Sequence, residues 1–383
     1  MNEVIKDLPE IFDEFADARK NAFLSVKELK DKDIPLVGAY CTYFPVEIAW
    51  AAGAATVGLC STSDETIPEA EKDLPSNLCP LIKSSYGFAK TDKCPFFYFS
   101  DVIVGETTCD GKKKMYELMD EIKPVYMMNL PNKQDEKAKR YWADEVAEFK
   151  TYMEDKLGEK ITEEKLRSAI KLGNDIRDAQ KNVAQTMKLD PTPMSGLDLF
   201  HVTYGTQFKM DKKGLADEIN ALAKRIVDEY DPSTREKKPR IVVTGCPMGG
   251  ATEKVIKAIE DNGGVIVAFE NCSGEKNFDR NVDLEADDLI RSLADRYIDI
   301  GCSVMSPDTN RFELLGRLID EYKADGVVEM DLVACHTYNV EREKIKRFVQ
   351  EEKNIPYTYV ETDFSSQDLG QLNTRMAAFI EML

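Results

Sequence analysis

The sequence predicts an α/β fold with two parallel-sheet domains and an additional helical region. Short β-branched runs alternate with helical patterns near both ends of the chain, which is typical of strand–helix–strand units. Between these regions lies a stretch rich in Glu, Lys, Ala and Leu, with apolar residues at helical spacing. The length of 383 residues allows two or three such domains.

Residues 1–136 predict the first Rossmann-like domain. Buried strands are expected over residues 34–40, 56–59, 102–105 and 125–128. A helix is expected to begin at Pro45, because proline suits the first helical turn. The alternation of strands with helices indicates a parallel sheet.

Residues 137–231 predict the helical region. Long helical patterns cover 136–158, 162–187 and 213–230. Thr162 is a suitable N-cap for the second of them. We expect this region to pack against or between the sheets.

Residues 232–383 predict the second Rossmann-like domain, which follows a polar linker around 231–239. Strands are expected over 240–245, 265–269, 326–330 and 357–360. Helices are expected over 251–262, 284–297, 312–324, 340–351 and 369–382.

The charge balance excludes some classes of protein. With 51 basic and 70 acidic residues the formal charge is −19, which disfavours binding to nucleic acid or to an anionic membrane. The chain lacks an apolar run of the roughly 20 residues that a membrane span needs, and its start lacks a signal pattern. We therefore expect a cytoplasmic protein, in which the nine cysteines are thiols or metal ligands.

The positions of the cysteines predict a shared site. No pair has C-x-x-C spacing, which excludes a zinc ribbon and a ferredoxin ligand run. Five cysteines follow predicted strands, where open parallel sheets bind ligands: Cys41, Cys109, Cys246, Cys272 and Cys335. If the domains face each other, these thiols can converge. A single cysteine is more often a small buried hydrophobe, the interpretation favoured for Cys60 and Cys94, while Cys302 is intermediate. Thiolates held by two sheets suit an iron–sulfur cluster better than zinc.

The motifs around these cysteines carry a resemblance that covers nearly the whole chain. They are Tyr40-Cys41-x-x-x-Pro45-x-Glu47, Leu78-Cys79-Pro80-Leu81-Ile82-Lys83, Gly105-Glu106-Thr107-Thr108-Cys109-Asp110-Gly111, Thr244-Gly245-Cys246-Pro247-Met248-Gly249-Gly250, Glu270-Asn271-Cys272, Cys302-Ser303-Val304-Met305-Ser306-Pro307 and Ala334-Cys335-His336-Thr337-Tyr338. On these residues the chain resembles the 2-hydroxyacyl-CoA dehydratase family, and more closely its branch of double-cubane cluster proteins.

The resemblance implies an iron–sulfur cofactor. By position, Cys79, Cys109 and Cys335 resemble the three cysteines that hold one 4Fe-4S cubane in the dehydratases. The double-cubane branch holds two cubanes joined by a bridging sulfide, an 8Fe-9S unit, and its three further cysteines resemble Cys41, Cys246 and Cys272. Cys302 also lies in a family-like motif and could replace one member of this second trio.

The implied function is that of a low-potential reductase component, a homodimer that reduces a small molecule. Its electrons would come from a separate ATP-hydrolysing iron–sulfur reductase. The chain lacks a G-x-x-x-x-G-K-[ST] loop, so ATP is expected to bind on that partner. One alternative is a 2-hydroxyacyl-CoA dehydratase subunit with a single 4Fe-4S cluster. Another is a non-catalytic electron-transfer protein.

Several other residues are candidates for a role near the cluster. His336 could donate a hydrogen bond or a proton there, or it could be a strand-end histidine bonded to backbone. Gly245, Gly249 and Gly250 are expected to let the backbone approach the cofactor closely. Glu47 is expected to serve ordinary capping of its helix. The run Lys112-Lys113-Lys114 is expected to face solvent.

Overall fold

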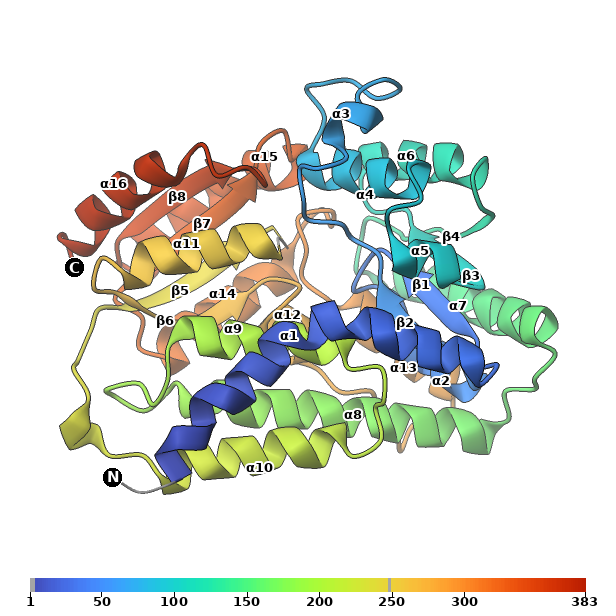
Figure 1. Cartoon of the computed structure of the whole chain (residues 1–383), viewed down its shortest axis with the longest axis horizontal. Helices are drawn as coiled ribbons and strands as arrows, with labels where there is room; N and C mark the ends of the chain where they lie inside the picture. The colour runs from blue at the N-terminus through green and yellow to red at the C-terminus, as the bar shows by residue number, and fades with distance from the viewer. Residues whose placement is uncertain (1–3, 247–248) are drawn as a thin grey trace.

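Two four-stranded parallel sheets form the framework of the protein. The computed structural model describes residues 4–246 and 249–383. The first sheet contains β1 (Leu36–Ala39), β2 (Ala55–Gly58), β3 (Val102–Glu106) and β4 (Val125–Met128). The second contains β5 (Arg240–Gly245), β6 (Val265–Glu270), β7 (Gly326–Leu332) and β8 (Tyr357–Thr362). The predicted α/β fold class is confirmed, and each sheet occupies one half of the molecule (Figure 1).

The strand order is the same in both sheets. It is β2-β1-β3-β4 in the first and β6-β5-β7-β8 in the second. The second strand in sequence therefore lies on one side of the first strand, and the third lies on the other side. Such a reversal opens a crevice at the carboxyl ends of the two strands that flank it, where open α/β sheets bind ligands. These switch points lie between β1 and β3 and between β5 and β7.

Helices connect the strands, because parallel neighbours cannot be joined by a tight hairpin. Those of the first domain are α2 (Val46–Ala51), α3 (Ile67–Ala70), α4 (Pro80–Lys90), α5 (Pro95–Phe99) and α6 (Asp110–Asp120). Those of the second are α11 (Gly250–Glu260), α12 (Glu275–Phe278), α13 (Leu289–Ile298), α14 (Thr309–Glu321), α15 (His336–Arg347) and α16 (Leu369–Ile380). No helix within residues 4–246 and 249–383 is long and apolar enough to cross a bilayer.

The predicted helical region consists of α7 (Glu136–Leu157), α8 (Glu163–Thr186), α9 (Gly196–Gly205) and α10 (Leu215–Asp228). The Thr162 side chain accepts a hydrogen bond from the backbone of Lys165 at 3.3 Å, which confirms the predicted N-cap. Helix α8 packs against α2 of the first domain and against α12 and α13 of the second. It runs beneath both sheets (Figure 1) and so ties the two halves together.

The sequence analysis missed the first helix, α1 (Val4–Asp31), which packs against α9 and α5. A signal for it exists: Phe12, Phe15, Ala22 and Val26 recur at helical spacing and are all buried. This helix crosses the molecule in front of both halves (Figure 1).

Several predicted boundaries are wrong by a few residues. The helix predicted over 284–297 begins only at Leu289, because the Asp288 side chain accepts a hydrogen bond from the backbone of Arg291 at 3.0 Å and caps it there. The helix predicted over 340–351 starts at His336 instead and continues into a short π-helical turn (Phe348–Glu352). Pro45 stands just before α2, as its N-cap.

Candidate metal centre

Four of the six cysteines predicted as ligands follow the strands that flank the two switch points. Cys41 follows β1 and Cys109 follows β3 in the first domain. Cys246 follows β5 and Cys335 follows β7 in the second. The other two lie after β6 and just before α4. The fold thus places thiols from both domains at the edges where ligands are expected.

Tight backbone turns precede Cys246 and Cys335. Gly245 has a φ of 116°, and a Cβ there would lie 2.1 Å from the carbonyl oxygen of Met330. The Cys246 N–H donates to that same oxygen at 2.9 Å. Ala334, with a φ of 57°, turns the chain just before Cys335. The close approach that Gly245 permits is therefore to strand β7.

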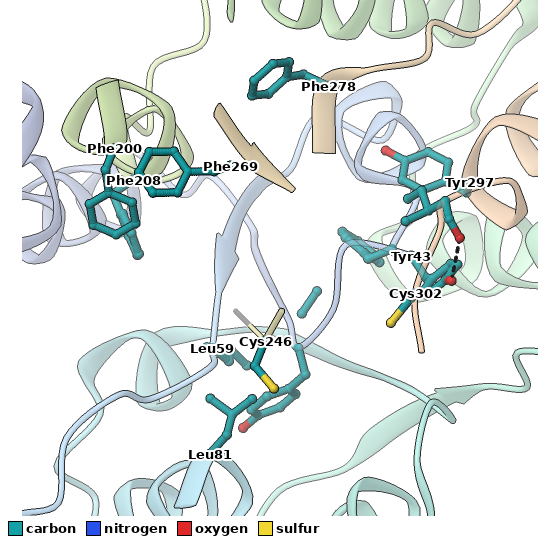
Figure 2. Close-up of a cluster of buried hydrophobic side chains, with 14 of the residues drawn as sticks. Tyr43, Leu59, Leu81, Phe200, Phe208, Cys246, Phe269, Phe278, Tyr297 and Cys302 are labelled. Carbon is teal, nitrogen blue, oxygen red and sulfur yellow. Dashed lines mark hydrogen bonds between the residues drawn. The ribbon is translucent and has the colours of Figure 1, made fainter. Parts of the chain in front are cut away.

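The thiols of Cys79, Cys246 and Cys335 meet, although they come from both domains. Hydrogen bonds from Cys246 and Cys79 hold the pKa of Cys335 well below its usual value. The contact with Cys335, and then burial, raise the pKa of Cys79. Burial, and then the same contact, raise the pKa of Cys246. In Figure 2, Cys246 is drawn in a cluster of buried side chains that also contains Leu81, two residues after Cys79.

Three of the cysteines stand at the N-termini of long helices. Cys79 is the N-cap of α4, Cys109 that of α6 and Cys335 that of α15. Backbone N–H groups of Leu81 and Ile82 lie against the sulfur of Cys79, and that of Tyr338 lies against the sulfur of Cys335. The positive end of a helix dipole favours a thiolate over a thiol, so these positions suit anionic sulfur ligands.

Cys109 lies near this trio of thiols without a described contact to it. A Cβ on Gly111 would lie 2.6 Å from Cδ1 of Ile82, so the first turns of α6 and α4 pack closely together. Cys109 and Cys79 cap these two adjacent helices. Among residues 4–246 and 249–383, the Cys109 thiol makes no hydrogen bond to another cysteine.

A second group of thiols consists of Cys41, Cys272 and Cys302. Burial raises the pKa of Cys41 well above its usual value, and the nearby Cys272 and Cys302 add to this effect. Burial likewise raises the pKa of Cys302 to about 11, opposed by the ammonium of Lys276. The Thr42 hydroxyl, next to Cys41, donates to the sulfur of Cys272 at 3.6 Å. Cys302 therefore lies with Cys41 and Cys272, and it stays an alternative ligand to a member of the predicted trio Cys41, Cys246 and Cys272.

Lys112 contradicts the expectation that the lysine run faces solvent. Its side chain is buried, and its Nζ donates to the carbonyl oxygen of Tyr40 at 2.8 Å. Nζ also lies 3.9 Å from the sulfur of Cys60. Lys113 and Lys114 do pair with carboxylates at the surface of α6. Lys112 thus places a positive charge beside the chain that leads into Cys41.

The sequence held a signal for the burial of Lys112. Met115, Tyr116 and Met119 are all buried on α6. Lys112 precedes them at spacings of three, four and seven, so it belongs to the same helical face. A lysine on an apolar face needs a buried partner for its charge.

The expectation that Glu47 serves only to cap its helix is also wrong. It lies in the first turn of α2, but its carboxylate is fully buried and pairs with Arg177 of α8 at 2.8 Å. The Tyr297 hydroxyl donates to the other carboxylate oxygen at 2.8 Å. Glu47 therefore links the first domain to the helical region and to the second domain.

Cys94 and Cys60, both expected to be small buried hydrophobes, have different environments in the structure. Cys94 is buried, and its sulfur accepts a hydrogen bond from the backbone of Phe97 at 3.4 Å, as an N-cap. Cys60 is half-buried, and its thiol donates to the carbonyl oxygen of Tyr40 at 2.9 Å. Cys60 also lines a cavity of about 240 Å³ with Cys41 and Cys272.

The remaining candidates occupy different settings. His336 is the first residue of α15, and its side chain is exposed. Gly249 has a φ of 45°, and a Cβ there would lie 2.7 Å from Thr62 Oγ1 and 2.9 Å from the Tyr204 hydroxyl. Gly250 has open space around it. Pro247 and Met248, of the same motif, lie outside the described residues. The roles of His336 and the glycines stay predictions.

The arrangement suits a large inorganic unit. In the described ranges 4–246 and 249–383, no three His, Cys, Asp or Glu side chains are arranged around a single metal ion. The thiols instead form two groups that each draw on both domains, and two members of the second group, Cys41 and Cys272, line a cavity. Cysteines at three helix N-termini and the buried ammonium of Lys112 near Cys41 fit a cofactor that binds through several thiolates.

Fold and thiols together define a two-domain α/β protein with cysteines gathered between its parallel sheets. A family model described as 2-hydroxyglutaryl-CoA dehydratase, D-component, matches residues 41–383. The chain belongs to this family, which confirms the resemblance at the level of the family.

Curated relatives extend over nearly the whole chain. The chain is 53% identical to “Putative dehydratase subunit YjiM” of Escherichia coli strain K12, over 99% of this chain and all of that protein. It is 21% identical to the beta subunit of (R)-2-hydroxyglutaryl-CoA dehydratase of Acidaminococcus fermentans, over 97% of this chain and 99% of that protein. It is 25% identical to a benzoyl-CoA reductase subunit of Thauera aromatica, over 80% of this chain and 76% of that protein. The protein is thus related to subunits of dehydratases and reductases.

Proposed function

We propose that this protein is a double-cubane iron–sulfur protein that reduces a small molecule. Six cysteines would hold the cofactor: Cys41, Cys79, Cys109, Cys246, Cys272 and Cys335. The electrons would come from a separate ATP-hydrolysing iron–sulfur reductase. The observation that carries this proposal is the meeting of Cys335 with both Cys79 and Cys246. Cys246 has no counterpart in the trio expected of a one-cubane dehydratase.

The chain supplies the environment that such a cofactor needs. Thiolates at the N-termini of α4, α6 and α15 face helix dipoles, which offset part of the cofactor's negative charge. The ammonium of Lys112 adds a positive charge near Cys41. The Thr42 hydroxyl donates to sulfur, and such hydrogen bonds tune cluster potential. When bound, the double cubane would supply two linked sites for storing electrons at low potential.

An iron count tests this proposal directly. The protein is purified anaerobically, and iron and acid-labile sulfide are measured per chain. Two cubanes give about eight irons per chain, and one cubane gives about four. About eight irons would support the double cubane, whereas about four would contradict it.

Single replacements test which cysteines take part. Cys41→Ser, Cys246→Ser and Cys272→Ser should each halve or abolish the iron content. Cys94→Ser is the matched control, because serine can keep the N-cap hydrogen bond to Phe97. If the first three variants keep full iron content, the second trio is wrong.

A second candidate function is a 2-hydroxyacyl-CoA dehydratase subunit with one cubane. The positions of Cys79, Cys109 and Cys335 at three helix N-termini favour it, as do the names of the relatives. Iron content of about four, unchanged by Cys41→Ser and Cys272→Ser, would support this alternative. Reduction of a small molecule that requires both ATP and the partner would support the double-cubane reductase, and would also exclude a purely electron-storing protein.

A further inference from the structure

The cavity beside the second thiol group has walls from all three parts of the chain. Its volume is about 240 Å³. Cys41 and Cys272 line one part of it, and Arg177 of α8 and Arg296 of α13 line another. Most of the remaining wall is apolar, with Phe44 among its residues. A cavity of about 150 Å³ holds benzene, so this one has room for a small molecule.

Of the two buried arginines on the wall, Arg177 pairs with a carboxylate, whereas Arg296 makes no ion pair with one among the described residues. Arg177 Nη1 pairs with Glu47 at 2.8 Å, and its Nη2 donates to the side-chain oxygen of Asn174 at 2.6 Å. Arg296 donates from Nε to the carbonyl oxygen of Arg280 at 3.1 Å, and from Nη2 to that of Asn277. These carbonyl oxygens are neutral. Glu47 therefore forms an ion pair with Arg177 only, and the direct partners of Arg296 are neutral: two carbonyl oxygens and the Tyr297 ring, whose centroid lies 4.3 Å from its guanidinium.

Each of these arginines also has a buried N–H without a partner. Arg177 Nε and Arg296 Nη1 are both buried and lack hydrogen-bond acceptors among the described residues. Burial, and then the neighbouring charge of Arg177, lower the pKa of Arg296 to about 10. An unpaired buried cation is costly, and an anion bound against it removes much of that cost. The positive wall is notable in a protein whose formal charge is −19.

We propose that this cavity binds a small free carboxylate, with its carboxyl group against Arg177 and Arg296 and its short carbon chain toward Cys41 and Cys272. A carboxylate matches guanidinium geometry and charge. A thioester carbonyl lacks the charge that the wall requires. The inference rests on the proposed function only in naming this carboxylate as the substrate, since binding itself needs no electron transfer.

Calorimetric titration of the anaerobically purified full chain tests the proposal. The probes are acetate, propionate, butyrate and crotonate, each compared with its primary amide. The acids should bind at least about tenfold more tightly than the amides, because charge-assisted hydrogen bonds are lost in the amides. Equal binding of acid and amide, or no binding of any acid, would overturn the proposal, and this comparison needs no variant.

Two arginine variants on one helix locate the binding site. Arg296→Met should weaken acid binding by about tenfold or more. Arg291→Met is the matched control on α13, because Arg291 is partly exposed and pairs with Asp295 and Glu136. Circular dichroism establishes that both variants are folded. A folded Arg296→Met variant that binds acids normally, or an equal loss in Arg291→Met, would overturn the assignment.

Butyryl-CoA separates this proposal from a thioester site. Binding of butyryl-CoA without binding of butyrate would overturn the carboxylate assignment. The iron count is independent of these titrations. A protein that binds carboxylates and holds about four irons would refute the double cubane and leave the carboxylate site standing. A protein with about eight irons and no carboxylate binding would support the double cubane and refute the carboxylate site.

Discussion

Arg311 holds together the strands that carry the second-domain cysteines, and replacing it by methionine should strongly destabilise the protein. The side chain is fully buried. It pairs with Glu270 of β6 at 3.2 Å, with Glu329 of β7 at 3.0 Å and with Glu341 of α15 at 2.7 Å. It also donates to Thr244 of β5 at 3.0 Å. One guanidinium thus connects three neighbouring strands and the helix that Cys335 caps.

The expected magnitude follows from what remains after the change. Glu270 keeps an ion pair with Lys276 at 3.1 Å. Glu329 keeps only the hydroxyl of Tyr357 at 2.6 Å, which leaves its buried charge without a cation. Breaking one buried ion pair in this way costs about 3–5 kcal/mol in the free energy of unfolding. Arg311→Met should therefore lose about that amount.

Urea unfolding followed by circular dichroism measures the loss. Arg317→Met is the matched control on α14, because this arginine is partly exposed and pairs with Asp279 at 2.5 Å, so its loss should cost at most about 1 kcal/mol. Adding Glu329→Gln to Arg311→Met should restore part of the stability, because a neutral amide needs no cation. Equal losses in the two arginine variants, or no recovery with Glu329→Gln, would refute the reasoning.

Three further outcomes are expected. Gly245→Ala should destabilise the protein by about 3 kcal/mol or more, because its φ is 116° and its Cβ would meet a β7 carbonyl; Gly250→Ala, which has open space, should melt like the wild type in a thermal scan. Burial raises the pKa of Glu275 to about 7 from 4.5, so the folded state holds a proton that the unfolded state releases. As the pH rises from about 4.5 to about 7, the free energy of unfolding of the wild type should fall by about 3 kcal/mol relative to that of Glu275→Gln. Urea unfolding of both proteins at several pH values measures this difference, and a difference that does not change with pH would contradict the prediction. Thr42→Val should lower the cluster potential in a redox titration by removing the 3.6 Å hydrogen bond to Cys272, whereas Thr42→Ser should keep it, and equal potentials would count against a cluster there.

Much of the fold could be predicted from the sequence because its signals are local. The strand β5 (Arg240–Gly245) was predicted with its observed ends, since a β-branched run followed by glycine marks a buried strand. The Thr162 N-cap needs only the three residues that follow it. The placement of cysteines after strands followed from the same reasoning, because parallel strands all end at one edge of a sheet.

The candidate site was less predictable, because its contacts join distant parts of the chain. Lys112 lies in a run of three lysines, and only the packing of α6 distinguishes the buried one from the two at the surface. Glu47 looked like a capping residue, but its partner Arg177 stands 130 residues away. No local pattern can pair two such charges.

The sequence by itself determined the two alternating α/β domains, the helical region between them and the presence of thiols at strand ends. These follow from hydrophobic periodicity and chain punctuation, which act over a few residues. Only the tertiary structure decided that Cys335 meets both Cys79 and Cys246, and that Arg177 and Arg296 lie on one cavity wall where only Arg177 pairs with a carboxylate. Those outcomes depend on how the two sheets and α8 pack together, because the burial of apolar surface brings together residues that lie far apart in the sequence.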